Sequence, residues 1–292
     1  MPRIFRLLLV GLALVAADRA AAQDSGDRAP VDTALIVSVD VSGSVNEGRY
    51  ELQMNGIAKA LEDPEVIAAM LSGPRASTMF TMVEWSERPV AAIPWTRIAS
   101  RADALALAAR VRRTPRPQGE FTCVAHMMRF VSDLVLPTLP VRAQRVVMDV
   151  SGDGVDNCDD DPAAAQMRDM LVATGMTING LPINEGDPAQ PVGGGSYRAP
   201  GRPFQPRTFK VKTLEPWYRK NVIGGPDAFL IPAHGYGDFD RAIKEKFALE
   251  ISAGPPVRAR FAATGAARVL GAGREAAVHA ELKGRGGRSA SP

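Results

Sequence analysis

Short apolar runs alternate with stretches of helical periodicity along most of the chain. Residues 34–39 (Ala-Leu-Ile-Val-Ser-Val) form a run rich in β-branched residues, which is typical of a strand buried on both faces. The next stretch places apolar residues at the 3.6-residue spacing of an amphipathic helix. These residues are Tyr50, Met54, Ile57, Ala58 and Leu61. The pattern therefore begins with a buried strand followed by a helix.

The same reading predicts the remaining elements. Further strands are expected over residues 77–85, 90–93, 145–150, 177–183 and 228–231. Further helices are expected over residues 65–71, 100–111, 124–135, 163–173, 215–221 and 239–251. Strands that alternate with helices predict an α/β fold with a doubly wound, mostly parallel central sheet flanked by helices. The hydrophobic content of 46% is ordinary for a globular protein, and we expect a single domain.

The ends of the chain fall outside this pattern. Arg3 and Arg6 precede an apolar stretch over residues 7–17 that is much shorter than a membrane span, and three alanines end at Ala22. We therefore predict a signal peptide over residues 1–22, cleaved rather than kept as an anchor, and an exported protein in the periplasm or beyond. No later segment is apolar enough to span a membrane. Residues 253–292 hold an excess of basic residues and few large apolar ones, and are predicted to be a disordered tail.

Charge and cysteine content narrow the function only slightly. The net charge of +3 is close to neutral and says little about partners, among which we expect no nucleic acid. Cys123 and Cys158 either form a disulfide in an oxidising compartment or remain two buried thiols. Two cysteines without nearby histidines are too few for a structural zinc site. His126 lies off the apolar face of its predicted helix, and no second histidine or cysteine is spaced to join it as a ligand.

Oxygen-bearing side chains follow two of the predicted strands. Asp40, Ser42 and Ser44 leave the first strand at alternate positions, which point to the same side of an extended segment. Asp153, flanked by glycines, follows the strand at 145–150, and Thr122 precedes a helix. Parallel strands deliver their carboxyl ends to one edge of a sheet, where ligands bind. These hard oxygen ligands indicate a site for Mg²⁺, or for Mn²⁺ or Ca²⁺.

The motif Asp40-x-Ser42-x-Ser44, together with Thr122 and Asp153-Gly154, resembles the metal-ion-dependent adhesion site of von Willebrand factor A domains. The resemblance covers residues 31–252. The sequences Asp-Val-Ser-Gly-Ser, Val-Ser-Gly-Asp-Gly and Ile-Asn-Gly-Leu-Pro-Ile are similar to an uncharacterised family of exported proteobacterial A-like proteins. The resemblance implies that the three hydroxyls bind the cation directly, and that the two aspartates act directly or through waters. It also implies an open coordination position for a carboxylate of a partner protein.

Two features depart from or extend that resemblance. Cys123 replaces the small residue that more often follows the threonine, and Cys158 lies five residues beyond Asp153. We hypothesise that a Cys123–Cys158 disulfide pins the two metal-binding loops together. The long segment 184–213 carries five basic residues and leaves its strand at the same edge, which suggests either a basic rim that selects an acidic partner or a solvated insertion.

The predicted function is an exported, non-enzymatic, cation-dependent protein-binding module whose partner presents an acidic residue to the metal. A metal-dependent hydrolase or phosphatase is the alternative. Phosphotransfer on Asp40 usually needs a second carboxylate two residues later, where this chain has Ser42. Acyl transfer lacks a Gly-x-Ser-x-Gly elbow. A structural envelope protein that does not use the metal is a third reading.

Overall fold

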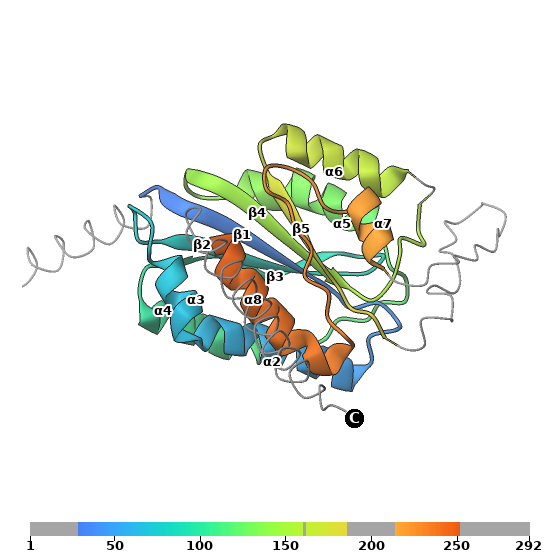
Figure 1. Ribbon diagram of the computed structural model, residues 1–292, viewed down its shortest axis with the longest axis horizontal. Coiled ribbons are helices and arrows are strands. Elements are labelled where there is room, and N and C mark those ends of the chain that lie inside the picture. Colours follow the sequence, from blue (N-terminus) through green and yellow to red (C-terminus); the bar gives the residue numbers. More distant parts are fainter. Residues whose placement is uncertain (1–28, 160–161, 186–213, 252–292) are drawn as a thin grey trace, which may run out of the picture. The chain divides into compact units, whose positions relative to one another are not determined.

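Strand β1 (Val31–Asp40) is the central strand of a five-stranded sheet (Figure 1). The computed structural model describes residues 29–159, 162–185 and 214–251. The predicted signal peptide 1–22, the tail 253–292 and most of the 184–213 segment lie outside these residues. All ten positions of β1 are buried, as the apolar run predicts.

The strand order is β3-β2-β1-β4-β5. The other four strands are β2 (Thr78–Trp85), β3 (Val90–Ile98), β4 (Ala143–Gly152) and β5 (Thr177–Pro182). β1 pairs in parallel with β2 and β4, and β4 pairs in parallel with β5, whereas the edge strand β3 is antiparallel to β2. The prediction of a doubly wound, mostly parallel sheet flanked by helices is confirmed.

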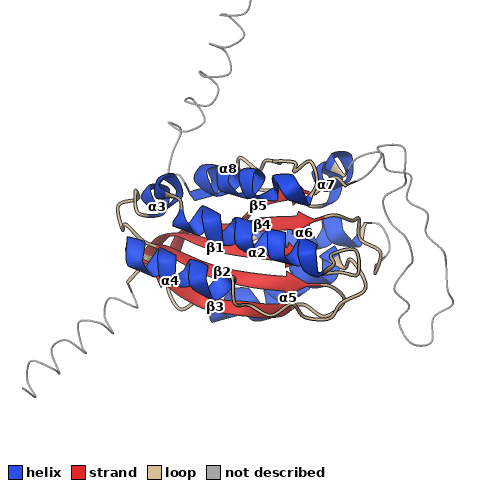
Figure 2. Cartoon of the chain, turned by 90° about the horizontal axis from the view of Figure 1, so that it is seen from below, coloured by secondary structure: helices blue, strands red, loops and turns tan. Residues whose placement is uncertain are grey.

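Side chains of β1 alternate between the two faces of the sheet. Leu35, Val37 and Val39 enter one core, and Ile36 enters the other. The helices that cover the first face are α2 (Glu47–Glu62), α3 (Pro64–Met70), α4 (Arg101–Val111) and α8 (Phe239–Ile251). The helices that cover the second face are α5 (Val124–Phe130), α6 (Ala163–Ala173) and α7 (Glu215–Asn221). Figures 1 and 2 show these two layers on either side of the sheet.

Two elements differ from the sequence expectation. The predicted helix over 124–135 is α-helical only in α5, and it continues as a π-helical turn, η1 (Val131–Val135), and a short 3-10 turn, η2 (Leu136–Thr138). The strand expected at 228–231 makes only isolated bridges beside β5, between Gly180 and Leu230 and between Ile183 and Ala233. Pro226 and Pro232 flank this segment, and a proline cannot donate a ladder hydrogen bond.

Strand β3 is longer than predicted and extends five residues beyond the expected end at Ile93. It pairs with β2 on one side only and passes through Pro94, a residue that sheets tolerate at their edges. Among the described residues, no helix is long and apolar enough to cross a membrane.

Candidate metal centre

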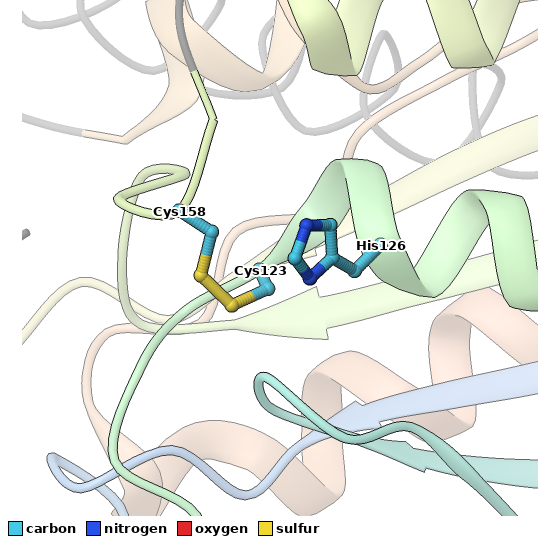
Figure 3. Close-up of side chains that lie close together, drawn as sticks. All are labelled: Cys123, His126 and Cys158. Atoms are coloured by element: carbon cyan, nitrogen blue, oxygen red, sulfur yellow. A yellow bond between two sulfur atoms is a disulfide. The ribbon is translucent and has the colours of Figure 1, made fainter. Parts of the chain in front are cut away.

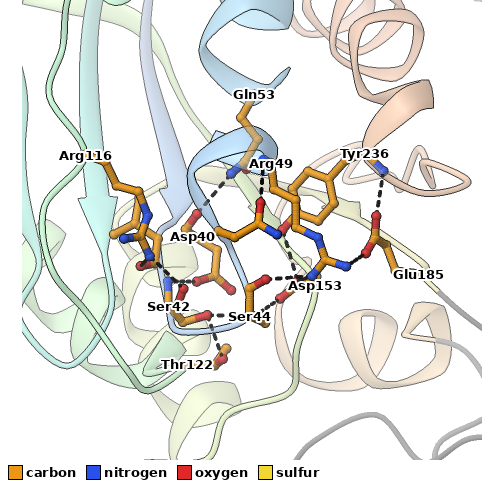
Figure 4. Close-up of polar contacts among 12 residues, drawn as sticks. Asp40, Ser42, Ser44, Arg49, Gln53, Arg116, Thr122, Asp153, Glu185 and Tyr236 are labelled. Carbon is orange, nitrogen blue, oxygen red and sulfur yellow. Dashed lines mark hydrogen bonds and ion pairs between the residues drawn. The ribbon is translucent and has the colours of Figure 1, made fainter. Parts of the chain in front are cut away.

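Three loops at the carboxyl edge of the sheet bring the five predicted residues together (Figure 4). The loop after β1 carries Ser42 and Ser44, the segment before α5 carries Thr122, and the loop after β4 carries Asp153. Asp40 is the last residue of β1. The parallel pairing of β1 with β4 makes both strands end at this edge, so the fold itself places the first and third loops side by side.

The three hydroxyls form a chain of contacts. Thr122 Oγ1 lies 3.3 Å from Ser42 Oγ, which lies 3.2 Å from Ser44 Oγ. Ser44 Oγ donates to Asp153 Oδ1 at 2.6 Å. Ser42 and Thr122 are buried and Ser44 is exposed, so the three contacting hydroxyls extend from the interior to the surface.

Asp40 lies at the floor of the site and is fully buried. Its Oδ1 accepts from the Ser42 backbone N–H at 2.8 Å, whereas its Oδ2 has no hydrogen-bond partner. Burial, with the nearby negative charge of Asp153, raises the pKa of Asp40 to about 8. A buried carboxylate oxygen without a donor is costly unless a cation or a proton compensates it.

Asp153 is the second carboxylate, and it has more partners. Its Oδ2 accepts from the Tyr236 hydroxyl at 3.0 Å and lies 3.8 Å from Arg49 Nη1. Burial raises the pKa of Asp153, and the hydrogen bonds from Ser44 and Tyr236 oppose that rise. The raised pKa values show that burial disfavours the charged form of both aspartates, so each takes up a proton more readily than an exposed carboxylate unless a cation compensates its charge.

Two glycines allow the loops to approach this closely. A Cβ on Gly152 would lie 3.0 Å from Asp40 Oδ2 and 3.0 Å from the Tyr218 hydroxyl oxygen. A Cβ on Gly154 would lie 3.0 Å from Thr122 Oγ1. The glycines around Asp153 thus leave space for the side chains of Asp40 and Thr122.

Several residues around the site were missed by sequence reasoning. Arg49, in the first turn of α2, donates to the Ser44 backbone oxygen at 2.6 Å and forms an ion pair with Glu185. Its guanidinium also lies 5.2 Å from the centre of the Tyr236 ring. Tyr236 begins η3 (Tyr236–Asp238), in the Gly-rich turn before α8 that the sequence shows only as a strand-to-helix connection.

Two further side chains support the backbone of the first loop. Gln53 Nε2 donates to the Asp40 backbone oxygen at 3.2 Å. Arg116 Nη2 donates to the backbone oxygens of both Val41 and Ser42, each at 3.3 Å. Nothing in the sequence indicates that Gln53 or Arg116 contacts this loop.

The Thr122 segment and the loop after Asp153 are held together by hydrogen bonds that involve the side chains of Asp156 and Asn157 and one backbone pair. The Thr122 N–H donates to Asn157 Oδ1, and the Asn157 N–H donates to the Thr122 oxygen, both at 2.9 Å. Asp156 Oδ2 accepts from the Ala125 N–H at 2.8 Å, while its Oδ1 accepts from the Cys158 N–H at 2.9 Å. These bonds fix Thr122 relative to Asp153.

The same two segments carry the cysteines, which the structure joins as a disulfide between Cys123 and Cys158 with the Cα atoms 5.1 Å apart. His126 lies beside them (Figure 3). Its ligand-type nitrogen and the two sulfurs all lie within 4.8 Å of one another. The expectation that no cysteine joins His126 is therefore wrong, because spacing along the sequence does not reveal that the loop after β4 folds back over the start of α5.

The oxygen donors of the five predicted residues suit a hard divalent cation. The set consists of two carboxylates and three hydroxyls, the ligand types that Mg²⁺, Mn²⁺ and Ca²⁺ prefer. The unpartnered Asp40 Oδ2 fits the same conclusion, since a cation or its bound water would satisfy it. The residues present thus fit the metal that the motif implies.

Comparison with known proteins gives one family. A model described as "Protein of unknown function (DUF1194)" matches residues 30–255, which is most of the chain. No curated protein matches the chain.

Solved structures show similar folds at low sequence identity. The pilus adhesin SpaC from Lactobacillus rhamnosus GG is 15% identical, with a TM-score of 0.51, over 76% of this chain and 30% of SpaC. A von Willebrand factor type A protein from Catenulispora acidiphila is 13% identical over 75% of this chain and 42% of its own, with a TM-score of 0.48. Proximal thread matrix protein 1 from the mussel byssus, solved with a zinc-occupied MIDAS motif, is 13% identical over 76% and 46%, also with a TM-score of 0.48.

This chain spans less than half the length of each of these three proteins. The likeness to SpaC, whose TM-score is 0.51, concerns the fold alone: a mostly parallel sheet flanked by helices.

Proposed function

The chain belongs to the family described as "Protein of unknown function (DUF1194)", and we propose that it is a divalent-cation-dependent protein-binding module. The observation that carries this proposal is the convergence of Ser42, Ser44, Thr122 and Asp153 above the unpartnered carboxylate oxygen of Asp40. A sheet that serves only as a scaffold does not require five oxygen-bearing side chains from a strand end and three loops to meet at one point.

Each residue has a distinct part in holding the cation. Ser42, Ser44 and Thr122 offer neutral oxygens, and Asp40 and Asp153 offer the negative charge. Gln53 and Arg116 hold the backbone of the first loop, so that the hydroxyls stay oriented. Mg²⁺ fits this set best, with Mn²⁺ or Ca²⁺ as substitutes. A bound cation would supply an electrophilic coordination position to an incoming carboxylate.

The side open to a partner is the side of Ser44, the most exposed of the five residues. The partner group that fits is an aspartate or glutamate side chain, because a carboxylate is the protein ligand that such cations prefer. Arg49, one third exposed beside Ser44, is ion-paired with Glu185, so the charge that attracts a partner carboxylate would come from the bound cation.

We propose a binding role rather than an enzymatic one. The hydroxyls of Ser42 and Ser44 contact each other, Thr122 and Asp153, and no contact links either to a histidine among the described residues. A serine nucleophile needs an adjacent base to activate it. We also propose that the protein is exported, because a disulfide between Cys123 and Cys158 persists in oxidising compartments.

The test is a titration of Mg²⁺, Mn²⁺ and Ca²⁺ into the chain while thermal unfolding is followed. At about 100 times Kd a bound cation stabilises the folded state by about 2.7 kcal/mol. For a domain of this size that corresponds to a rise in Tm of about 5–10 °C. The rise is expected to vanish in Asp40→Asn and to weaken strongly in Thr122→Val, which loses only a hydroxyl.

The matched control is Asp133→Asn, an exposed aspartate outside the site, which should keep the full rise in Tm. If no cation raises Tm in the unaltered chain, the metal-binding proposal fails. Capture of a partner from an envelope extract should be abolished by a chelator and by Asp40→Asn. Hydrolysis of phosphoesters or acyl esters that is lost in Asp40→Asn would instead establish the enzyme alternative.

A further inference from the structure

A second group of metal-ligating side chains begins at Cys123, the residue that follows Thr122 of the oxygen site. Cys123, His126 and Cys158 bring two sulfurs and an imidazole nitrogen within 4.8 Å of one another (Figure 3). Cys123 and His126 are three residues apart at the start of α5, a spacing that puts them on one side of a helical turn. Cys158 comes from the loop after β4. The group is soft, in contrast to the all-oxygen site of Asp40.

The three ligand atoms are near enough for a shared zinc ion once the sulfurs are no longer bonded to each other. Tetrahedral zinc binds thiolate sulfur at about 2.3 Å and imidazole nitrogen at about 2.0–2.1 Å, which places its ligand atoms roughly 3.4–3.8 Å apart. The three ligand atoms already lie within 4.8 Å in the disulfide-bonded chain. Breaking the S–S bond would let the sulfurs separate by the small distance that a shared ion requires.

The histidine is oriented as metal-bound histidines usually are. Its Nε2 lies 3.1 Å from Asp159 Oδ2, the residue directly after Cys158. A carboxylate on one ring nitrogen fixes the orientation of the ring and increases the basicity of the other nitrogen. A metal at the cysteines would take that other nitrogen, Nδ1.

Hydrogen bonds hold the Thr122 segment against the loop after Asp153 independently of the disulfide. The paired bonds between Thr122 and Asn157, both 2.9 Å, and the bond from Ala125 N–H to Asp156 Oδ2 join the same segments independently of the sulfurs. Reduction of the disulfide therefore leaves Cys123 and Cys158 as neighbours. Cys158 is only partly buried, and His126 and Asp159 line a surface pocket, so a reductant and a metal ion both have access from solvent.

We propose that reduction of the Cys123–Cys158 disulfide creates a zinc site in which the two thiolates and His126 bind the ion and Asp159 orients the imidazole. A dithiol reductant supplies two electrons and two protons, the S–S bond breaks to two thiols, and the reductant closes to its own disulfide. Zinc binding then releases the two thiol protons to solvent. The ion links the Thr122 segment to the Asp153 loop in the reduced chain, as the disulfide does in the oxidised chain. This site is independent of the proposed oxygen site.

The test uses Co²⁺ as a spectroscopic probe in the full chain, reduced with a phosphine that does not bind metals. One equivalent of Co²⁺ should give thiolate-to-cobalt charge-transfer absorption, which Zn²⁺ abolishes by displacement. The oxidised chain should give none. Cys158→Ser should remove the absorption, and Asp159→Asn should weaken Co²⁺ binding by about 10–100-fold. Asp40→Asn should leave it unchanged, which separates this site from the oxygen site.

The matched control for Asp159 is Asp133→Asn, because Asp133 lines the same pocket. Its Co²⁺ affinity should equal that of the unaltered chain. The proposal is overturned if the reduced chain, with two thiols by mass spectrometry, shows no charge-transfer absorption. It is equally overturned if His126→Ala binds Co²⁺ with unchanged affinity and spectrum, or if circular dichroism shows that the chain unfolds on reduction.

Discussion

At the scale of single residues, Glu84 is a buried acid close to the first loop of the oxygen site. It lies on β2, is 2% exposed, and accepts from the Tyr50 hydroxyl at 2.6 Å. The same hydroxyl lies 3.0 Å from the Thr114 backbone oxygen and has one proton to donate. Burial raises the pKa of Glu84 to about 7, while Tyr50 and Arg116 oppose that rise. When Glu84 is protonated, it can donate to Tyr50, and Tyr50 can donate to Thr114.

This arrangement predicts how stability depends on pH. Because the folded-state pKa of Glu84 lies above its ordinary value of 4.5, the stability that this group contributes is full below pH 4.5 and is lost as pH rises toward 7. Glu84→Gln mimics the protonated form. We expect it to match the unaltered chain near pH 4.5 and to be more stable by about 2–3 kcal/mol at pH 8. Urea unfolding at several pH values measures the difference.

Glu51→Gln serves as the control for Glu84→Gln, since Glu51 is exposed. Its stability should follow that of the unaltered chain at every pH. Parallel pH profiles for Glu84→Gln and the unaltered chain would contradict the prediction.

The sequence predicts some residues of the site and not others for a physical reason. Asp40, Ser42 and Ser44 are close in sequence, and their shared direction follows from the geometry of an extended segment. Arg49 and Tyr236 reach the site from α2 and from the turn before α8, and their positions depend on how those helices pack. His126 and Cys158 meet for the same reason. Contacts between distant segments require the tertiary structure.

At the scale of elements, the start of helix α8 packs closely against helix α2 at Gly56. A Cβ on Gly56 of α2 would lie 2.7 Å from Phe239 Cδ1 and 3.3 Å from the Asp240 Cα. Gly56 and Phe239 are both buried. The space beside Phe239 thus requires a glycine at position 56, although glycine is less favourable than alanine inside a helix.

Gly56→Ala is therefore expected to destabilise the fold although alanine favours helices. Overpacking typically costs about 1–3 kcal/mol, whereas replacing glycine by alanine in a helix gains about 1 kcal/mol. The upper part of the overpacking range therefore exceeds the gain in helix propensity. We expect a net loss of about 1 kcal/mol in urea unfolding. Gly48→Ala in the same helix meets only Asn46 Oδ1, at 3.6 Å, and should be neutral or stabilising. A gain in stability for both variants would show that Phe239 moves away freely.

Element boundaries were predictable where a single pattern dominates. The helices α6, α7 and α8 match the expected ranges because one apolar face or a clear breaker defines each. The π-helical turn η1 follows α5 without any break in the apolar pattern, so the pattern reads as one helix. The bridges beside β5 depend on a neighbouring strand, which periodicity within one segment cannot indicate.

At the scale of the whole molecule, a buried ionic cluster joins the closing helix to the sheet. Lys246 of α8 has a fully buried side chain, whose Nζ lies 2.7 Å from Asp149 Oδ1 of β4. It also forms an ion pair with Glu250, one turn later in the same helix, and Glu250 accepts from Asn179 of β5 at 2.9 Å. Burial raises the pKa of Glu250 to about 7, and Lys246 opposes that rise. Lys246 thus binds two carboxylates, Asp149 of β4 and Glu250 of its own helix, and the cluster connects α8 to strands β4 and β5.

Lys246→Met tests what this cluster contributes to the fold. Methionine fills a similar volume but leaves Asp149 and Glu250 without a cation in a fully buried place, and breaking a buried pair in this way costs about 3–5 kcal/mol. We expect a loss of that size in urea unfolding at pH 7. The loss should shrink toward pH 4, because unpaired buried carboxylates take up protons in the folded state and their raised pKa values favour folding only at low pH.

The control is Lys244→Met in the same helix, whose partners Asp63 and Glu65 lie at the surface. This substitution should lower the free energy of unfolding by less than about 1 kcal/mol at any pH. Equal effects of the two substitutions would mean that the sheet and α8 are held together by apolar packing alone.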